Sequence, residues 1–351
     1  MFRLYYFLFA IVFSSSLAAQ AQSLYLENFV SPPGLFPANH GSSILELPDG
    51  NLLTCWYAGT QEKAPDVQVY CSRKLSASDS IWQSPTVAVA QKERMPGTPF
   101  KYRSLGNAAL YMDSENIVWL FYTPIMFFNG WSAAHVDYKT STDFGKTWSK
   151  AKSLKGFFGN LGKNKPIKID DTHFMIPLYH ELLSHTSYTC TIEHKLGKLV
   201  SKSCTPINGD NQLQPSLVLN KPNQLLAYMR MYKHDNIAVA EFDFKKKYWG
   251  ATTATNLHNP DAGVDAIKYN ENTILMVFND SSTSRSIMSL AYSTDGKKFK
   301  KIWDFENGLD CSYPAIIKTK DGNVHVTYTY NFRGAIKHVM FNSEWLKSVM
   351  N

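Results

Sequence analysis

The sequence predicts an all-β protein, a six-bladed β-propeller, on three observations. Six segments share one pattern, in which an apolar run, a hairpin turn and a second apolar or aromatic run follow one another. The turns recur at a nearly constant interval. Aromatic residues make up 14% of the chain, and no long segment has helical periodicity. One four-stranded sheet per repeat gives six blades around a central axis.

The six repeated segments span residues 43–57, 108–123, 165–180, 215–231, 265–280 and 314–330. Their turns are rich in Asp, Asn, Pro and Gly, and equivalent turn positions are Asp49, Asp113, Asp170, Lys221, Asn270 and Asp321. Successive positions are 64, 57, 51, 49 and 51 residues apart. Because a four-stranded blade takes roughly 40 to 50 residues, the first two blades are expected to carry longer loops.

Residues 1–21 have the pattern of a secretory signal peptide. Arg3 precedes a short apolar run over residues 4–13, and small residues end the segment at Ala19 and Ala21. The apolar run is too short to cross a bilayer. We therefore expect a protein without a membrane span, periplasmic or secreted, in which residues 22–351 form one propeller.

The formal net charge of the full chain is +7. A basic surface attracts acidic glycans or the anionic cell envelope. Nucleic acid is not an expected partner, because the protein is predicted to be exported and its lysines are dispersed. The longest basic run, residues 245–247, is predicted to be a solvated turn before Trp249.

Five cysteines in an exported chain permit disulfides but leave one over. Cys190 and Cys204 flank a predicted hairpin centred on residues 195–198. Cys55 and Cys71 can pair if their strands are neighbours; the alternative for each pair is buried free thiols. No Cys or His spacing indicates structural zinc, so no metal and no cofactor are expected.

Residues 141–148, with the sequence STDFGKTW, predict a hairpin corner that locks itself. Asp143 can accept backbone N–H groups across the turn, Gly145 can take the positive φ that closes it, and Trp148 can fold back as an apolar plug. The spacing S-x-D-x-G-x-T-W resembles the Asp-box of sialidases and related propellers. A shorter version runs from Ser293 to Phe299.

In a propeller, the polar residues at equivalent edges of the inner strands converge on one face. Those found at such edges here are His40, Glu62, Asp66, Asn107, Lys165, Gln214, Arg230, Asp265, Arg285, Tyr313 and His338. His338 and Lys337 fall on an expected outer strand, where we predict surface charge.

Recurring phrases over nearly the whole chain resemble the bacterial sialidase-like BNR-repeat family, whose members are described as exo-α-sialidases. The phrases are ELPDGNLL (46–53), GTQEKAPDV (59–67), NKP (164–166), QPSL (214–217), HNPDAGVDA (258–266), SYPAII (312–317) and IKHV (336–339). The resemblance implies a glycoside hydrolase that acts on a glycan. It also implies a site with three arginines that hold the substrate carboxylate, a Tyr nucleophile paired with a carboxylate, and an acid on a loop of the first blade.

Carried over by position, the resemblance makes Arg230 and Arg285 two of the clamp arginines and Tyr313 the nucleophile. The first-blade loop offers Glu62 and Asp66 as the acid. Lys165 and Asn107 lie where they can reach the ligand, and Asp265 either does so or orients Arg230 or Arg285.

Two positions depart from the family pattern. His40 stands where the first clamp arginine is expected, and a His does not replace a bidentate guanidinium. Gln214 stands where the carboxylate partner of the Tyr is expected, and an amide cannot accept the proton of a phenol.

Three hypotheses follow. The first is a sialidase-type hydrolase of a terminal acidic sugar. The second is a hydrolase or lyase on another acidic sugar such as a uronic acid, with His40 or Tyr313 transferring the proton. The third is a glycan-binding propeller without turnover. A monomer is expected in each case.

Overall fold

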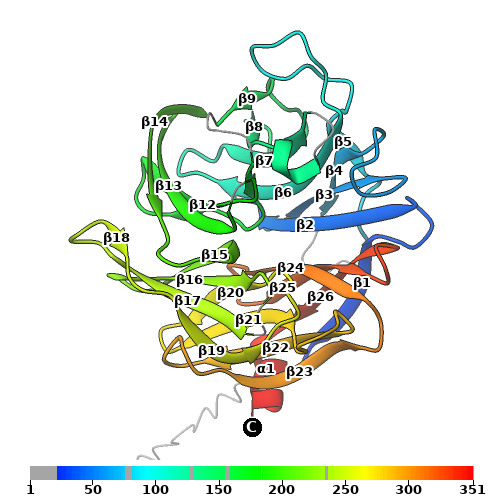
Figure 1. Ribbon diagram of the computed structural model, residues 1–351. Coiled ribbons are helices and arrows are strands. Elements are labelled where there is room, and N and C mark those ends of the chain that lie inside the picture. Colours follow the sequence, from blue (N-terminus) through cyan, green and yellow to red (C-terminus); the bar gives the residue numbers. More distant parts are fainter. Residues whose placement is uncertain are drawn as a thin grey trace, which may run out of the picture.

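Six antiparallel sheets surround a central axis in the computed structural model, which describes residues 22–75, 81–126, 130–154, 159–182, 184–233 and 236–350 (Figure 1). The inner strands of adjacent sheets contact one another around the axis. The predicted six-bladed β-propeller is therefore confirmed. The predicted signal peptide, residues 1–21, lies outside the described residues.

The first three blades follow the chain order. Blade one contains β2 (Ala38–Glu46), β3 (Leu52–Gly59), β4 (Gln68–Lys74) and β5 (Thr86–Val89). Blade two contains β6 (Ser104–Met112), β7 (Val118–Ile125), β8 (Asp137–Ser141) and β9 (Lys152–Ser153), with a 3-10 turn at Gly130–Ala133. Blade three has a split inner strand, β10 (Asn160–Gly162) and β11 (Ile167–Lys168), followed by β12 (His173–His180), β13 (Thr186–Lys195) and β14 (Lys198–Pro206).

The next blades repeat this order. Blade four contains β15 (Gln212–Lys221), β16 (Gln224–Met231), β17 (Asn236–Asp243), β18 (Tyr248–Trp249) and β19 (Thr253–His258). Blade five contains β20 (Asp265–Asn270), β21 (Thr273–Asn279), β22 (Ile287–Ser293) and β23 (Lys300–Asn307). Blade six contains β24 (Cys311–Lys318), β25 (Val324–Tyr330) and β26 (Ala335–Phe341). The chain ends in the helix α1 (Ser343–Met350).

Blade six takes its outermost strand from the other end of the chain. The strand β1 (Tyr25–Ser31) pairs antiparallel with β26, from Tyr25 opposite Phe341 to Ser31 opposite Ile336. The two ends of the propeller are thus joined within one sheet. Since β1 covers β26, the expectation of surface charge at His338 and Lys337 is wrong: both side chains are buried.

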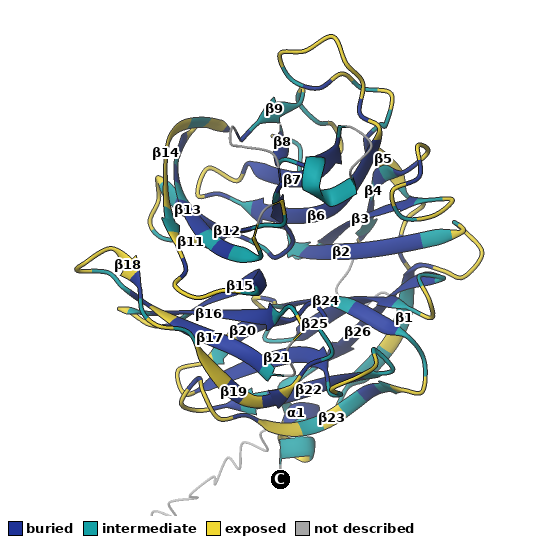
Figure 2. Cartoon of the chain, viewed as in Figure 1, coloured by how far each residue is buried: buried dark blue, intermediate teal, exposed yellow. Residues whose placement is uncertain are grey.

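The hydrophobic core is divided among the six contacts between neighbouring blades. Each large apolar cluster draws its residues from two adjacent sheets; one joins Leu53 of blade one to Leu120 of blade two, and another joins Ile44 of blade one to Ile336 of blade six. The inner and middle strands are accordingly buried on both faces, whereas outer strands such as β14 are largely exposed (Figure 2). Burial on both faces explains why the repeats read as continuous apolar runs rather than alternating ones.

The inner strands carry a β-bulge at matching positions in four blades. Register shifts occur between His40 and Ser43, Gly106 and Ala109, Leu213 and Ser216, and Ser312 and Ala315. Each bulge contains a residue with positive φ, namely Gly41, Asn107, Gln214 and Tyr313. Bulges turn side chains away from the regular alternation of a strand and are common beside functional sites.

Both predicted disulfides are present, since Cys55 bonds Cys71 and Cys190 bonds Cys204. Each pair faces directly across two neighbouring strands, β3 with β4 and β13 with β14. Among the described residues, the remaining Cys311 is a buried free thiol.

The corner at residues 141–148 has the predicted geometry. Asp143 accepts hydrogen bonds from the Thr147 backbone N–H at 2.8 Å and from its hydroxyl at 2.6 Å. Gly145 has a φ of 81°, and Trp148 packs against the apolar cluster between blades one and two. Asp295 makes equivalent backbone contacts in the shorter corner before Phe299. The lysines at 245–247 are exposed, as expected.

Within the described part of the chain, no helix has both the length and the apolar character needed to cross a membrane.

Candidate functional site

The bulges bring Tyr313, Gln214 and Asn107 together at one end of the axis. The amide of Gln214 donates a hydrogen bond to the Tyr313 hydroxyl at 3.0 Å and another to the Tyr179 hydroxyl at 3.3 Å. Asn107 donates to the same Tyr179 hydroxyl at 3.1 Å. Because Asn107, Gln214 and Tyr313 all have positive φ, an uncommon state for residues other than glycine, the backbone fixes where these three side chains point.

His40 lies against Tyr313, with 4.2 Å between the ring centroids. It is fully buried, and its Nδ1 contacts the Thr329 hydroxyl at 2.9 Å. Burial, together with the nearby cations Arg333, Arg285, Lys163 and Arg230, lowers the pKa of His40 well below its usual value. His40 is therefore neutral at neutral pH.

Arg230 and Arg285 come from different blades and meet at one point. Both guanidinium groups donate to the backbone carbonyl of Asp261, at 3.2 Å from Arg230 and 2.9 Å from Arg285. Arg230 also lies 3.4 Å from the Asp261 carboxylate and 3.7 Å from that of Glu181. The structure thus groups the two arginines that were predicted to bind substrate.

The carboxyl groups around the site differ in their environments. Burial raises the pKa of Glu181 and of Asp261 above their usual values, with Arg230 acting against it. Glu62 accepts a hydrogen bond from the Tyr57 hydroxyl at 3.3 Å and is ion-paired with Arg333 at 2.7 Å. Glu62, Tyr57 and Arg333 line a small pocket with His40.

Asp66 is turned into its own loop. Its carboxylate accepts the Thr60 hydroxyl at 2.5 Å and the Thr60 backbone N–H at 2.8 Å, and these bonds lower the pKa of Asp66. Its role in the structure is therefore to hold the loop that carries Glu62.

Lys165 and Asp265 form an ion pair of 2.5 Å between blades three and five. Asp265 is buried and also accepts hydrogen bonds from the Ser216 hydroxyl at 2.6 Å and the Ile316 backbone N–H at 2.9 Å. Asp265 contacts three blades in this way, and its described polar contacts do not include Arg230 or Arg285. The side chain of Lys165 remains 20% exposed.

Lys163 also faces the site, although the sequence did not point it out. It lies between the two halves of the split inner strand, fully buried, with its ammonium 5.8 Å from the centroid of the Tyr313 ring. The ammonium donates to Asn164 Oδ1 at 2.7 Å and to the Pro314 carbonyl at 2.5 Å, and burial lowers its pKa to about 7. Gly263 packs against Gln214 and Lys163, and a Cβ added at Gly263 would lie 2.9 Å from Gln214 Oε1 and 3.4 Å from Lys163 Cε.

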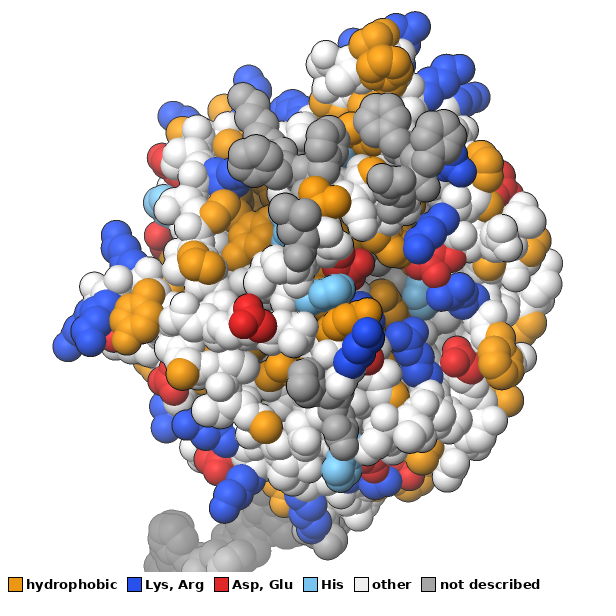
Figure 3. All heavy atoms as spheres, viewed as in Figure 1, with side chains coloured by type: hydrophobic (Ala, Val, Ile, Leu, Met, Phe, Trp, Pro, Cys, Tyr) orange, Lys and Arg blue, Asp and Glu red, His pale blue; other side chains and the backbone are white. Residues whose placement is uncertain are grey.

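The sequence also gave no sign of Tyr57, Tyr179, Glu181, Asp261 and Arg333. What they share is position, because each lies within a few residues of the end of a strand, at the same end of the propeller as the bulges. Figure 3 shows acidic, basic and histidine side chains gathered near the middle of the face viewed down the axis.

This arrangement suits an anionic ligand. Arginine and lysine side chains attract a carboxylate, neutral amide and phenol groups offer directional hydrogen bonds, and a neutral His can accept a proton.

The comparisons agree with this geometry. A family model described as a BNR repeat-like domain matches residues 50–326. No curated protein sequence matches the chain. Among solved structures, a Hadza microbial sialidase superposes with a TM-score of 0.76 at 15% identity, over 91% of this chain and 69% of that one.

Two further structures are similar. The intramolecular trans-sialidase from Ruminococcus gnavus has a TM-score of 0.69 at 11% identity, over 88% of this chain and 95% of that one. A protein of unknown function from Dyadobacter fermentans has a TM-score of 0.71 at 12% identity, over 90% and 97%. At these identities the structures establish the sialidase fold alone, and the family model covers most of the sequence. The chain belongs to the family of proteins with a BNR repeat-like domain and has the fold of the sialidases.

Proposed function

We propose that the protein is a glycoside hydrolase of the sialidase type, which removes a terminal acidic sugar from a glycan. One observation carries the proposal: Tyr313, held by Gln214 and packed on neutral His40, stands among the cations Arg230, Arg285, Lys163 and Arg333. The similarity of the fold to sialidase structures supports the proposal that the site at the propeller axis binds the sugar. The predicted signal peptide supports action in the periplasm or outside the cell.

Substrate binding uses the two converging arginines. Arg230 and Arg285 already share the Asp261 carbonyl, so a sugar carboxylate entering beside them would complete their hydrogen bonds. Asn107 and Gln214 offer amide groups to the sugar hydroxyls.

In the first chemical step, the Tyr313 oxygen attacks the anomeric carbon while the bond to the leaving oxygen breaks. The phenol proton passes to His40, whose ring lies against Tyr313 and which is neutral before the step. A carboxylic acid protonates the leaving oxygen. Water then hydrolyses the glycosyl–tyrosine bond, and its proton returns the acid to its starting form while His40 returns a proton to Tyr313.

Glu181 is a better candidate than the predicted Glu62 for the general acid that protonates the leaving oxygen. Burial raises the pKa of Glu181, which favours a protonated carboxyl, whereas Glu62 is engaged in an ion pair with Arg333 at 2.7 Å. Asp66 is bound within its own loop.

A second candidate is a lyase acting on a uronic sugar. It is favoured by Gln214, which occupies the place of the carboxylate expected beside the nucleophile, and by His40, a neutral base against Tyr313. In that reaction the base removes the proton next to the sugar carboxylate, the cations stabilise the resulting charge, and the leaving oxygen takes a proton from Tyr313. The product then contains a new carbon–carbon double bond.

The test is a substrate panel for the purified mature chain and for Tyr313→Phe. The panel contains fluorogenic sialosides, uronic-acid glycosides, uronate polymers and neutral glycosides. Release of an acidic sugar that is lost in the variant supports the hydrolase. An ultraviolet-absorbing unsaturated product supports the lyase instead. Glycan binding without turnover in either protein would overturn both catalytic readings and leave a binding module.

A further inference from the structure

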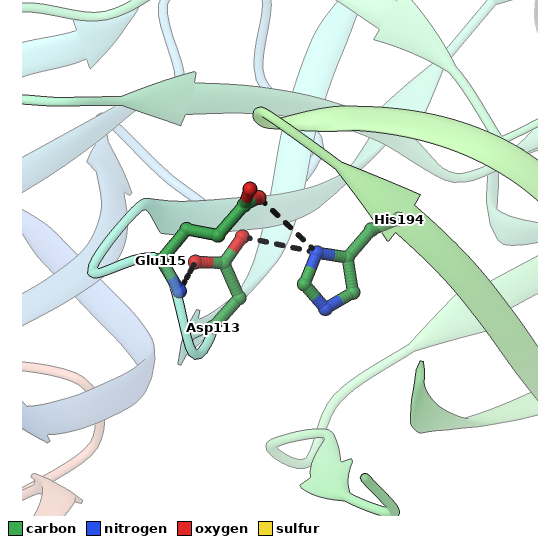
Figure 4. A group of neighbouring side chains, drawn as sticks. All are labelled: Asp113, Glu115 and His194. Atoms are coloured by element: carbon green, nitrogen blue, oxygen red, sulfur yellow. Dashed lines mark hydrogen bonds and ion pairs between the residues drawn. The ribbon is translucent and has the colours of Figure 1, made fainter. Parts of the chain in front are cut away.

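A second cluster of charged side chains lies at the other end of the propeller, between blades two and three. Asp113 and Glu115 belong to the turn between β6 and β7, and His194 lies near the end of the strand β13, before the hairpin that leads to β14 (Figure 4). The site residue Asn107 lies in the first half of β6, whereas Asp113 follows the end of that strand. On blade three, His194 pairs with the Thr172 end of β12, whereas Tyr179 lies near its other end. The cluster is therefore separate from the candidate active site.

The carboxylate of Asp113 is fixed by its own turn. One oxygen accepts the backbone N–H groups of Glu115 at 3.0 Å and Ile117 at 2.9 Å, and the other accepts the indole N–H of Trp119 at 2.8 Å. That second oxygen, Oδ2, lies 3.3 Å from His194 Nδ1. Glu115 Oε2 accepts the Leu196 backbone N–H at 2.6 Å and lies 3.8 Å from the same Nδ1.

His194 provides an independent sign that something is bound. Its side chain is 1% exposed, and neither ring nitrogen makes a hydrogen bond. The ring packs against Phe174 and Trp119, with centroid separations of 5.5 and 6.1 Å, and this packing directs Nδ1 toward the two carboxylates. Among the described residues, Nδ1 therefore has only the two carboxylates beside it and makes no hydrogen bond to either. A buried polar atom that lacks a hydrogen bond is costly, so a cation bound between Nδ1 and the carboxylates would stabilise this conformation.

From this geometry we propose that Asp113, Glu115 and His194 bind a divalent transition-metal ion, with zinc as the best fit. A tetrahedral zinc ion lies about 2.0 to 2.2 Å from nitrogen and oxygen ligands, which places its ligands roughly 3.4 Å apart. The observed separations of 3.3 and 3.8 Å bracket that value, and all three ligand atoms lie within 4.8 Å of one another. An imidazole ligand favours zinc over calcium or magnesium, which prefer oxygen.

The ligands come from two blades, so the ion would join blades two and three at their outer seam. Of the three ligands only Glu115 is open to solvent, with 34% of its side chain exposed, so the fourth ligand would be a water that enters from this side. Such a site is structural, and its loss should leave the geometry around Tyr313 intact.

The proposal is tested on the full mature chain after chelator treatment and dialysis. Titration calorimetry with zinc should show one tight site per chain, and the thermal midpoint should rise by several degrees, with no rise on adding calcium or magnesium. Cobalt(II) in place of zinc should give the intense visible absorption of a tetrahedral complex.

Glu115→Gln is the decisive variant, because the residue is exposed and an amide oxygen can still accept the Leu196 N–H. This variant and His194→Gln should each lose most of the zinc affinity and of the thermal shift. The matched control is His173→Gln, which removes a partly exposed histidine paired with Asp170 on a nearby turn and should bind zinc as the parent does. If the parent gains no stability from zinc, or if Glu115→Gln binds zinc as tightly, the proposal is overturned and His194 is an ion-pair partner only.

Discussion

Gln214 and His40 are the two residues that set this protein apart from the pattern of its family. Both contact Tyr313, so the departures lie on one side chain rather than being scattered over the site. An amide and a neutral imidazole replace a negative and a positive group. The net charge next to Tyr313 is therefore nearly unchanged, while the group that can accept a proton moves from the Gln214 position to the His40 position.

The acid that protonates the leaving group can be identified by comparing two single variants. We expect Glu181→Gln to lower kcat by about 100- to 10,000-fold on a natural glycan, the usual range for general acid catalysis. The loss should be much smaller on an aryl glycoside, whose leaving group needs no proton. Glu62→Gln should have the weaker effect on the glycan, because Glu62 is engaged in an ion pair with Arg333.

Steady-state kinetics on both substrates check this prediction, with Asp66→Asn as the control for loop structure. A large loss in Glu62→Gln that spares the aryl glycoside would instead assign the acid to the first-blade loop.

At the scale of single strands, β25 and β26 carry a buried pair of histidines. His325 Nδ1 lies 3.0 Å from His338 Nε2, and both rings are fully buried. Burial, with a contribution from Lys74, lowers the pKa of His325 to about 4, against a weaker opposing effect of Asp321. Burial likewise lowers the pKa of His338 well below its usual value.

Because both histidines are buried in their neutral form, we expect the free energy of unfolding to fall in mild acid. In the unfolded chain the imidazoles bind protons near pH 6.5, whereas folded His325 does not do so until about pH 4. Between these values the unfolded state holds more protons, so stability decreases as the pH falls, by on the order of 3 kcal/mol for His325 once the pH is below both values. Urea unfolding between pH 7 and 4.5 should show this slope, and His325→Gln should reduce it. An unchanged slope in the variant would assign the acid sensitivity to other groups.

The sequence predicted the strand pairs well and the bulges not at all, for a physical reason. Apolar runs flanking a turn are local signals, and all six hairpins were found from them. The bulges at Tyr313 and Asn107 depend on how each inner strand packs against its neighbours around the axis. Neither Tyr nor Asn is a residue type that indicates a bulge in a sequence. The sequence did not point to Lys163 for the same reason. Lys165 was chosen because it precedes Pro166, but the interruption of the inner strand between β10 and β11 places Lys163 next to the axis.

For the whole molecule, the ring is closed by contacts that no local pattern reveals. The strand β1 precedes the first repeat by sequence and completes the last blade in space. Because the ring is closed, each of the six blades packs against a neighbouring blade on both sides. The site at the axis needs all six, because its residues come from blades one, two, three, four, five and six.

Asn28 of β1 provides the test of closure. Its side-chain oxygen accepts the indole N–H of Trp82 at 2.8 Å in blade one and lies 3.0 Å from His338 Nδ1 in blade six. Asn28→Ala leaves both buried groups without this partner, and we expect it to lower the free energy of unfolding by about 2 to 6 kcal/mol, roughly 1 to 3 for each group. Equilibrium urea unfolding measures the loss. The control is Glu27→Gln, on the same strand but exposed, which should cost less than about 1 kcal/mol. Because the seam between blades one and six borders His40, Asn28→Ala should also weaken turnover before the protein unfolds. Equal stabilities for the two variants would show that the backbone ladder of β1 alone closes the ring.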